Sequence, residues 1–322
     1  MNRRNLLAAT LTLSLLALTG RVSAQSYPSK PITIVVPFGP GGTADVVVRA
    51  MSDHLRNTLG QPIVIDNRIG AAGSIATTLV ARAPADGYTL LIATQSHTAN
   101  PSLYANLPWD PVKSFAPISL VGVIPNVIAV PTSAPYKTLK EFVAYSKQHP
   151  GANYASAGVG TSIHLTAELL KQTTGISMTH IPYKGDADSY RALRAGDVAM
   201  APLGLGFAKP FVDNGELRVL AVTTPQRSPL MPDAPTPAES GFPDFEVRPW
   251  YAFLAPAGTP DAVVAKLNAA VAAALKAPDL QSKLLSLGLM LEPGSPEELS
   301  KFLQTDTARW AKTIKQAGIR LE

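Results

Sequence analysis

The sequence contains no cysteine among its 322 residues. The protein therefore has no disulfide, no thiolate nucleophile and no leading cysteine that could carry an acyl anchor. Its stability has to come from buried apolar surface, and a chain of about 300 residues usually forms two domains with cores of their own.

The sequence also lacks clusters of basic residues. It has no run of five or more lysines and arginines and no basic stripe interleaved with aromatic residues, the patterns typical of nucleic-acid binding. The formal net charge of +5 owes much to the first 24 residues, which contain three arginines and no acidic residue. The remaining 25 basic and 23 acidic residues give a net charge of +2. The composition therefore predicts no nucleic-acid partner.

Long apolar runs are absent except near the N-terminus. Residues 6–18 are apolar, Arg3 and Arg4 precede them, and the small residues Val22-Ser23-Ala24 follow. This stretch is shorter than the roughly 20 residues that span a bilayer, and its flanks are typical of a cleaved export signal. We expect residues 1–24 to form a signal peptide that is cleaved near Ala24, with export to the periplasm by the Sec or the twin-arginine route. No later segment predicts a membrane span.

A glycine-rich segment, IVVPFGPGGTAD (residues 34–45), follows an apolar run and precedes a predicted helix. Backbone N–H groups at such a helix start bind anions. The same letters, Gly39-Pro40-Gly41-Gly42-Thr43-Ala44, fit the dinucleotide fingerprint G-x-G-x-x-G/A, and Asp66 lies where the ribose-binding acid would be. An exported NAD(P)-dependent oxidoreductase is therefore the alternative to a simple anion-binding protein. Pro40 disfavours it, because proline has no N–H to donate.

Predicted strands and helices alternate along most of the chain. Strands are expected at residues 32–36, 63–65, 88–93, 127–130, 154–156, 178–181, 198–201, 217–223 and 250–254, and helices at 43–59, 74–83, 139–147, 161–173, 186–195, 260–276, 280–287 and 296–317. Alternation of this kind predicts an α/β fold with mostly parallel sheets.

The pattern is interrupted at Ile124-Pro125 and again by a proline-rich tract, so we expect two lobes with a ligand cleft between them. Lobe 1 would comprise residues 25–124 and 250–322, and lobe 2 residues 125–249. The loops that follow the strands should face the cleft, because open α/β sheets bind ligands there.

Three loops rich in small and hydroxyl residues lie between a predicted strand and a helix start: residues 38–45, 94–100 and 156–164. A carboxylate accepts about four hydrogen bonds, so facing loops could bind each end of a small acid. The predicted ligand-binding residues in these loops are Phe38, Gly39, Gly41, Gly42, Thr43, Asp45, Ser96, His97, Thr98, Ala157, Gly158, Gly160, Thr161, Ser162 and His164. The alternative is ordinary helix capping, with Asp45 as a first-turn carboxylate.

Catalytic and metal-binding patterns are missing. There is no G-x-S-x-G elbow, and Ser96 and His97 are only sequence neighbours. His164 and Glu168 are spaced i, i+4 but supply at most two ligands, fewer than a zinc site needs. We expect no enzyme activity, no cofactor and no bound metal.

Several segments together resemble the Bug family, the periplasmic solute-binding proteins of tripartite tricarboxylate transporters. They are ITIVVPFGPGGTAD, NRIGAAGSIA, ADGYTLL, NPSLYANLPWDPVKSFAPISLV, YASAGVGTSIHL, HIPYKG, LAVTTPQRSPLMPDAPTPAESGFP and LAPAGTP. The resemblance implies a two-lobed periplasmic-binding fold of type II and a small carboxylate ligand held by residues 38–45 and 157–162. It also implies partner permease subunits in the membrane, or a sensor protein instead, and we expect a monomer.

One departure from the family concerns the ligand. Family members often carry an aspartate in an FDN-like stretch that meets a ligand amino group, whereas this chain reads Pro202-Leu203-Gly204-Leu205. We therefore expect Leu203 at the site and a di- or tricarboxylate or aromatic acid without an amino group. The alternative places Leu203 in the core and lets Asp45 or Asp186 pair with an amino group.

Overall fold

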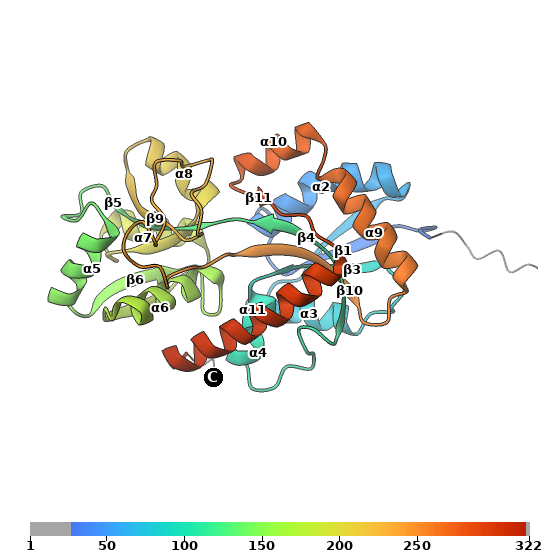
Figure 1. Cartoon of the computed structure of the whole chain (residues 1–322), viewed down its shortest axis with the longest axis horizontal. Helices are drawn as coiled ribbons and strands as arrows, with labels where there is room; N and C mark the ends of the chain where they lie inside the picture. The colour runs from blue at the N-terminus through green and yellow to red at the C-terminus, as the bar shows by residue number, and fades with distance from the viewer. Residues whose placement is uncertain (1–26, 320–322) are drawn as a thin grey trace, which may run out of the picture.

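The structure is a computed structural model that describes residues 27–319 (Figure 1). The predicted signal peptide, residues 1–24, lies outside the described residues. Across residues 27–319, no helix is both long enough and apolar enough to cross a membrane.

The first part of the chain forms one large sheet and its helices. Its elements are β1 (Ile32–Val36), α2 (Thr43–Leu59), β2 (Ile63–Asn67), the 3-10 turn η1 (Ala71–Gly73), α3 (Ser74–Ala81), β3 (Thr89–Thr94), α4 (Ser96–Leu103) and β4 (Phe115–Val123). The last part returns to this sheet with β10 (Trp250–Pro256), α9 (Asp261–Ala274), α10 (Pro278–Ser286), β11 (Met290–Leu291) and α11 (Pro296–Ala317).

The middle of the chain forms a second group of elements. They are β5 (Asn126–Pro131), α5 (Leu139–Gln148), β6 (Ala152–Ser156), α6 (Ser162–Thr174), β7 (Met178–Pro182), α7 (Asp186–Ala195), β8 (Ala201–Gly204), α8 (Leu205–Asp213) and β9 (Leu217–Val222). Figure 1 shows the two groups side by side as two lobes, joined where β4 leads into β5 and where the chain returns to β10. The two-lobed α/β fold is thus confirmed.

The expectation of mostly parallel sheets is wrong. The six-stranded sheet has the order β11-β4-β10-β3-β1-β2, and only the β1–β2 and β1–β3 pairs in it are parallel. β10 returns from the second lobe and inserts antiparallel between β3 and β4. In the second lobe, β5 is antiparallel to both β8 and β9, whereas β6 and β7 are parallel. The chain crosses twice between lobes, and these crossings produce the antiparallel ladders.

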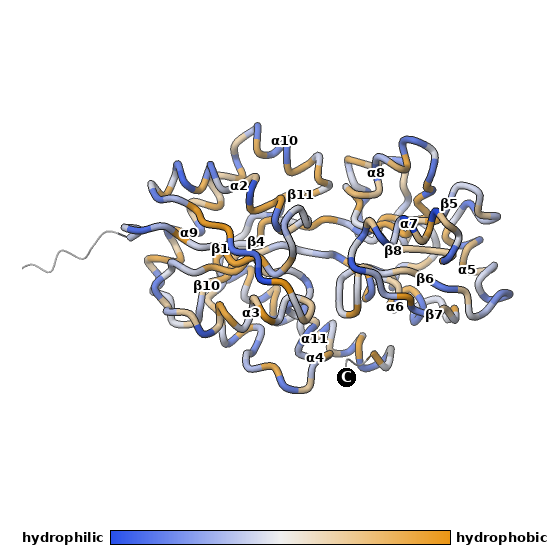
Figure 2. Tube along the Cα trace, turned by 180° about the vertical axis from the view of Figure 1, so that it is seen from behind, coloured by the Kyte–Doolittle hydropathy of each residue, from blue (hydrophilic) through white to orange (hydrophobic). Residues whose placement is uncertain are grey.

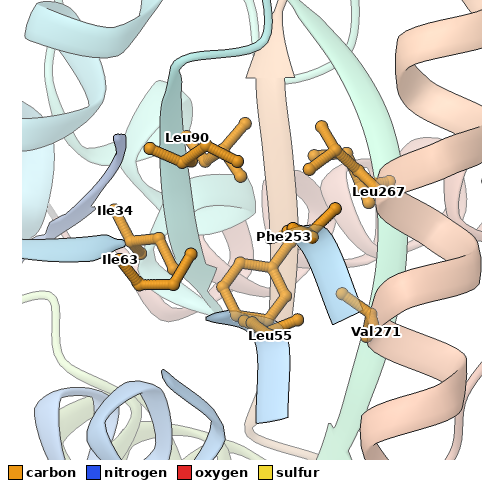
Figure 3. A pocket seen from close by; sticks show the side chains of 10 residues that line it. Ile34, Leu55, Ile63, Leu90, Phe253, Leu267 and Val271 are labelled. Carbon is orange, nitrogen blue, oxygen red and sulfur yellow. The ribbon is translucent and has the colours of Figure 1, made fainter. Parts of the chain in front are cut away.

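Apolar side chains fill the interior of each lobe. In α2 the buried residues recur on one face, so the helix packs against the sheet through that face, and Figure 2 shows hydrophobic and hydrophilic residues alternating along outer helices such as α2 and α10. In the first lobe, Phe253, Leu267 and Leu90 point toward a small gap in this core (Figure 3). Its volume of about 10 Å³ and its wholly apolar lining make it a packing gap, since a water needs more room and polar partners.

Helix α11 packs against both lobes. Leu299 and Leu303 in its first half belong to the apolar cluster around Trp250, in the first lobe. Trp310 and Ile314 in its second half pack in the cluster that holds the core of the second lobe. Helix α11 therefore packs against the cores of both lobes, and its position across them is visible in Figure 1.

Candidate functional site

A cavity of about 600 Å³ lies between the two lobes. The first lobe and the crossing strands contribute Phe38, Gly39, Pro40, Gly41, Gly42, Thr43, Ala44, Ile69, Thr94, Gln95, Ser96, Ile124, Pro249, Trp250 and Tyr251. The second lobe contributes Asn126, Ala157, Thr161, Ser162, Ile163, Lys184, Gly185, Asp186, Ala187, Gly204 and Phe207. The described part of the chain brings no arginine to these walls.

Five helices begin at the cavity: α2 and α4 from the first lobe, and α6, α7 and α8 from the second. The first N–H groups of a helix have no partner within it, and the helix dipole adds partial positive charge there. No side chain caps the starts of α2, α4, α7 and α8. Apart from the Leu205 N–H at the start of α8, which donates to the Pro125 carbonyl at 3.0 Å, the helix starts supply backbone donors to the cavity, which suits an anion without needing a basic side chain.

The first glycine loop is held from behind by Asp45. Its buried carboxylate accepts hydrogen bonds from the Gly41 N–H at 2.9 Å, from Arg49 Nε at 2.8 Å and from Asn67 Nδ2 at 3.0 Å. Burial opposes ionisation of Asp45, but these hydrogen bonds outweigh it and lower the pKa of the carboxyl. Asp45 does not line the cavity. It positions the loop, because it stabilises Gly41 at φ +80°, a conformation that favours glycine.

The second loop is a helix rather than the loop that the sequence predicts. α4 places Ser96 at the cavity, where its Oγ donates to the Gly160 carbonyl of the other lobe at 3.4 Å. Gln95 also lines the cavity, and its buried amide has no hydrogen-bond partner among the described residues.

The next two predicted residues of α4 lie away from the cavity. His97 stacks on Trp109, and its Nε2 contacts the Pro111 carbonyl at 2.8 Å. Burial lowers the pKa of His97 to about 4, so the ring is neutral. Thr98 Oγ1 donates to Asp306 on α11 at 2.6 Å. Both side chains are buried and lie off the cavity wall, because helix α4 turns them inward.

The third loop presents Ala157, Thr161 and Ser162 to the cavity. The other predicted residues, Gly158, Gly160 and His164, do not line it. Their polar groups are used within the loop. The Gly158 N–H donates to Ser156 Oγ at 3.1 Å, and the Gly160 N–H donates to His164 Nδ1 at 3.3 Å.

His164 therefore acts as a neutral acceptor that shapes the third loop. Burial lowers its pKa to about 4, and the neighbouring ring of His180, stacked at 4.2 Å between centroids, lowers it further. Thr161 is a helix cap as well as a cavity residue, since its side chain accepts the His164 N–H.

Leu203 does not reach the cavity. Its side chain is fully buried in the core of the second lobe, because the strand β8 alternates its side chains and turns this one inward. The acidic residue on the wall is Asp186, at the start of α7, whose Oδ2 accepts the Gly204 N–H at 3.2 Å. Burial raises the pKa of Asp186 to about 6, and the hydrogen bond from Gly204 offsets part of that effect.

Several wall residues outside the predicted set come from the approach to α7 and from β10, among them Lys184, Trp250 and Tyr251, and Asp186 was considered only as an alternative. Lys184 lies between β7 and α7, and Asp186 is the first residue of α7, so the strand-end rule could have found both. The β10 residues gave no such signal, because their position depends on how the chain returns between the lobes.

In the described part of the chain, neither a metal cluster nor a serine–histidine pair lies on the cavity wall. Within residues 27–319, no three histidine or acidic side chains gather in a way that could hold a metal ion. Ser156 Oγ and His180 Nε2 are 2.6 Å apart, but Ser156 is fully buried and lies off the cavity wall. Asp66, the ribose-binding residue of the dinucleotide alternative, pairs with Arg68 at 2.9 Å and does not line the cavity either.

Comparison with known proteins decides the family. The sequence model described as "Tripartite tricarboxylate transporter family receptor" matches residues 47–319. The chain belongs to this receptor family. Protein BugT of Bordetella pertussis is 33% identical to this receptor over 100% of both chains, which confirms the resemblance to the Bug family.

Two solved structures are similar throughout to this receptor. A Rhodopseudomonas palustris protein with adipate is 38% identical, covers 92% of this chain and 100% of its own, and has a TM-score of 0.84. MatC of the same organism, with bound malate, is 34% identical, covers 89% and 100%, and has a TM-score of 0.81. Membership of a receptor family gives no support to the oxidoreductase alternative.

Proposed function

We propose that this receptor is a periplasmic solute-binding protein that captures a small carboxylate between its lobes and delivers it to membrane permease subunits. It binds the acid without changing it chemically. The observation that carries the proposal is the convergence of five helix starts, four of them without a side-chain cap, on one cavity. Both a backbone donor set and a favourable dipole suit a carboxylate there.

The size and lining of the cavity support an organic acid. About 600 Å³ is ample for a small acid and lies within the usual range for ligand pockets. Apolar side chains such as Phe38, Ile69 and Phe207 alternate with the helix starts, so the carbon skeleton of an acid can lie between its polar ends. The similar proteins with adipate and malate agree with this chemistry.

We infer that the ligand contacts come from the predicted residues on the wall and not from the buried ones. The contact residues would be Phe38, Gly39, Gly41, Gly42, Thr43, Ser96, Ala157, Thr161 and Ser162. We also propose the lobe boundaries given above, with the second half of α11 shared between the lobes, and a monomer in solution.

The test is a thermal-shift screen of the purified protein without its signal peptide. Succinate, malate, adipate, citrate and terephthalate are offered beside the corresponding amides, which keep the skeleton but lack the charge. A ligand at 100 times its dissociation constant adds about 2.7 kcal/mol of stability, so a true ligand raises the melting temperature clearly. If no acid raises it, or the amides raise it equally, carboxylate binding is refuted. NAD and NADP in the same screen test the oxidoreductase alternative.

A further inference from the structure

Asp186 is the acidic side chain on the cavity walls, and few hydrogen-bond donors or positive charges balance its negative charge. Its hydrogen bond from Gly204 leaves most of its acceptor capacity unused, because an ionised carboxylate accepts about four hydrogen bonds. Within residues 27–319, no basic side chain forms an ion pair with it at 4.0 Å or less. Among the described residues, the one other charged side chain on the walls is Lys184, which is exposed.

The position of Asp186 makes one side of the cavity unfavourable for an anion and leaves the other side favourable. Asp186 is the first residue of α7, and it accepts the N–H of Gly204, the cap position of α8. Its negative charge therefore offsets the positive ends of these two helices. The starts of α2 and α4, across the cavity, and of α6 have no acid on the wall beside them. An anion is favoured at those starts and repelled from Asp186.

We propose that the ligand is a carboxylate that also carries a protonated amino group, and that Asp186 binds this ammonium while the carboxylate lies against the starts of α2, α4 and α6. This inference rests on the proposed function. A second carboxylate in the same place would face a like charge, whereas an ammonium would use the free acceptor positions and remove the cost of an unpaired charge.

The proposal reverses the expectation of an acid without an amino group. That expectation depended on Leu203 standing where relatives carry an aspartate, but Leu203 is part of the core. The carboxylate needed for an amino group comes instead from a different element, the start of α7.

The experiment is titration calorimetry near neutral pH with matched pairs of ligands. The pairs are aspartate and succinate, glutamate and glutarate, 2-aminoadipate and adipate, and phenylalanine and 3-phenylpropionate. Hydrogen bonds to charged groups predict that the best amino acid binds at least roughly tenfold more tightly than its partner without the amino group. Preference for the partner overturns the inference while leaving carboxylate binding intact, and failure of every acid overturns both proposals.

Two variants assign the effect to the residue. Asp186→Asn keeps the shape and an oxygen for the Gly204 N–H but removes the charge, so the amino acid should lose roughly tenfold or more in affinity and its partner should not. Asp188→Asn is the matched control, because Asp188 lies in the same first turn, pairs with Arg191 and is not on the cavity wall. Equal affinity of Asp186→Asn and the wild type for the amino acid refutes the assignment. Should Asp186→Asn fail to fold, the ligand pairs on the wild type still decide the ligand class.

Discussion

Replacement of Asp45 by asparagine tests how the first glycine loop is held in place. The side chain is about 1% exposed, and its two oxygens accept three hydrogen bonds. Oδ2 accepts from Gly41 and Arg49, and Oδ1 accepts from Asn67. An asparagine of nearly the same volume has to point its NH₂ group at one of these sets of donors, so at least one buried donor loses its acceptor.

The expected magnitude follows from these contacts. Each hydrogen bond to a buried charged group contributes about 1.5–3 kcal/mol, and a buried donor without a partner costs about 1–3 kcal/mol. We expect Asp45→Asn to lower the free energy of unfolding by roughly 3 kcal/mol. Because Gly41 is then free to leave its left-handed conformation, carboxylate affinity should fall as well.

The assays are urea unfolding and titration calorimetry near neutral pH. Arg49→Met is the control. Arg49 is half-exposed and supplies one of the three hydrogen bonds to Asp45, so its loss should lower stability by less than Asp45→Asn does. The deficit of Asp45→Asn should shrink under acid conditions. The folded pKa of Asp45 is lowered, so its stabilisation is present above the unfolded value of about 3.9 and is lost as pH falls through the folded value. An Asp45→Asn protein as stable as the wild type would refute the role given to this carboxylate.

Three further predictions concern the loop, a buried histidine and the support of the cavity wall. A side chain at Gly42 would place Cβ 3.1 Å from the Gly39 carbonyl oxygen. Gly42→Val should therefore reduce carboxylate affinity at least roughly tenfold with little change in melting temperature. Unchanged affinity by calorimetry would show that the loop only caps its helix. Burial lowers the pKa of His97 from 6.5 to about 4, so the unfolded chain takes up a proton that the folded chain excludes. Between about pH 6.5 and pH 5, the free energy of unfolding of the wild type should therefore fall by about 2 kcal/mol because of this site. Urea unfolding at the two pH values should show a correspondingly smaller fall for His97→Phe. An equal fall in the two proteins would contradict the assignment. Asp306 accepts the Trp250 Nε1–H at 2.8 Å and so supports the cavity wall through Trp250. Asp306→Asn should destabilise the protein by roughly 1–3 kcal/mol and change its tryptophan fluorescence. A variant with the wild-type spectrum and stability would contradict this role of Asp306.

The sequence predicted the helices and strands that are determined by neighbouring residues, and it missed elements whose local pattern is interrupted or that depend on distant parts of the chain. β1 and α2 have the expected bounds, because an apolar run, a glycine turn and an amphipathic period follow one another without interruption. α4 was expected as a loop, since Pro101 and several polar residues hide its helical period. β4 was missed because Pro117 interrupts its pattern and because its partner β10 lies far away in the sequence.

The candidate site shows the same division between local and long-range information. The rule that loops follow strands at a ligand cleft located the three loops correctly on the cavity wall. It could not tell which side chains turn inward. Thr43 and Ser162 line the cavity, whereas Asp45 and His164 are buried behind it and accept the N–H groups of their own loops. That difference depends on packing within the lobe, which the spacing of residues does not record.

The construction of the wall from helix starts also bears on release of the ligand. A single helix start typically contributes about 0.3–1 kcal/mol to binding of an anion, less than a buried arginine pair would. Several starts together hold a carboxylate only while both lobes supply them, since α2 and α4 belong to one lobe and α6 to the other. A ligand bound to both sets stabilises the arrangement in which the lobes are close, and separation of the lobes removes part of its donors at once. Under the function proposed above, in which the ligand passes to permease subunits, this weakness aids release, because separating the lobes is enough to lower the affinity.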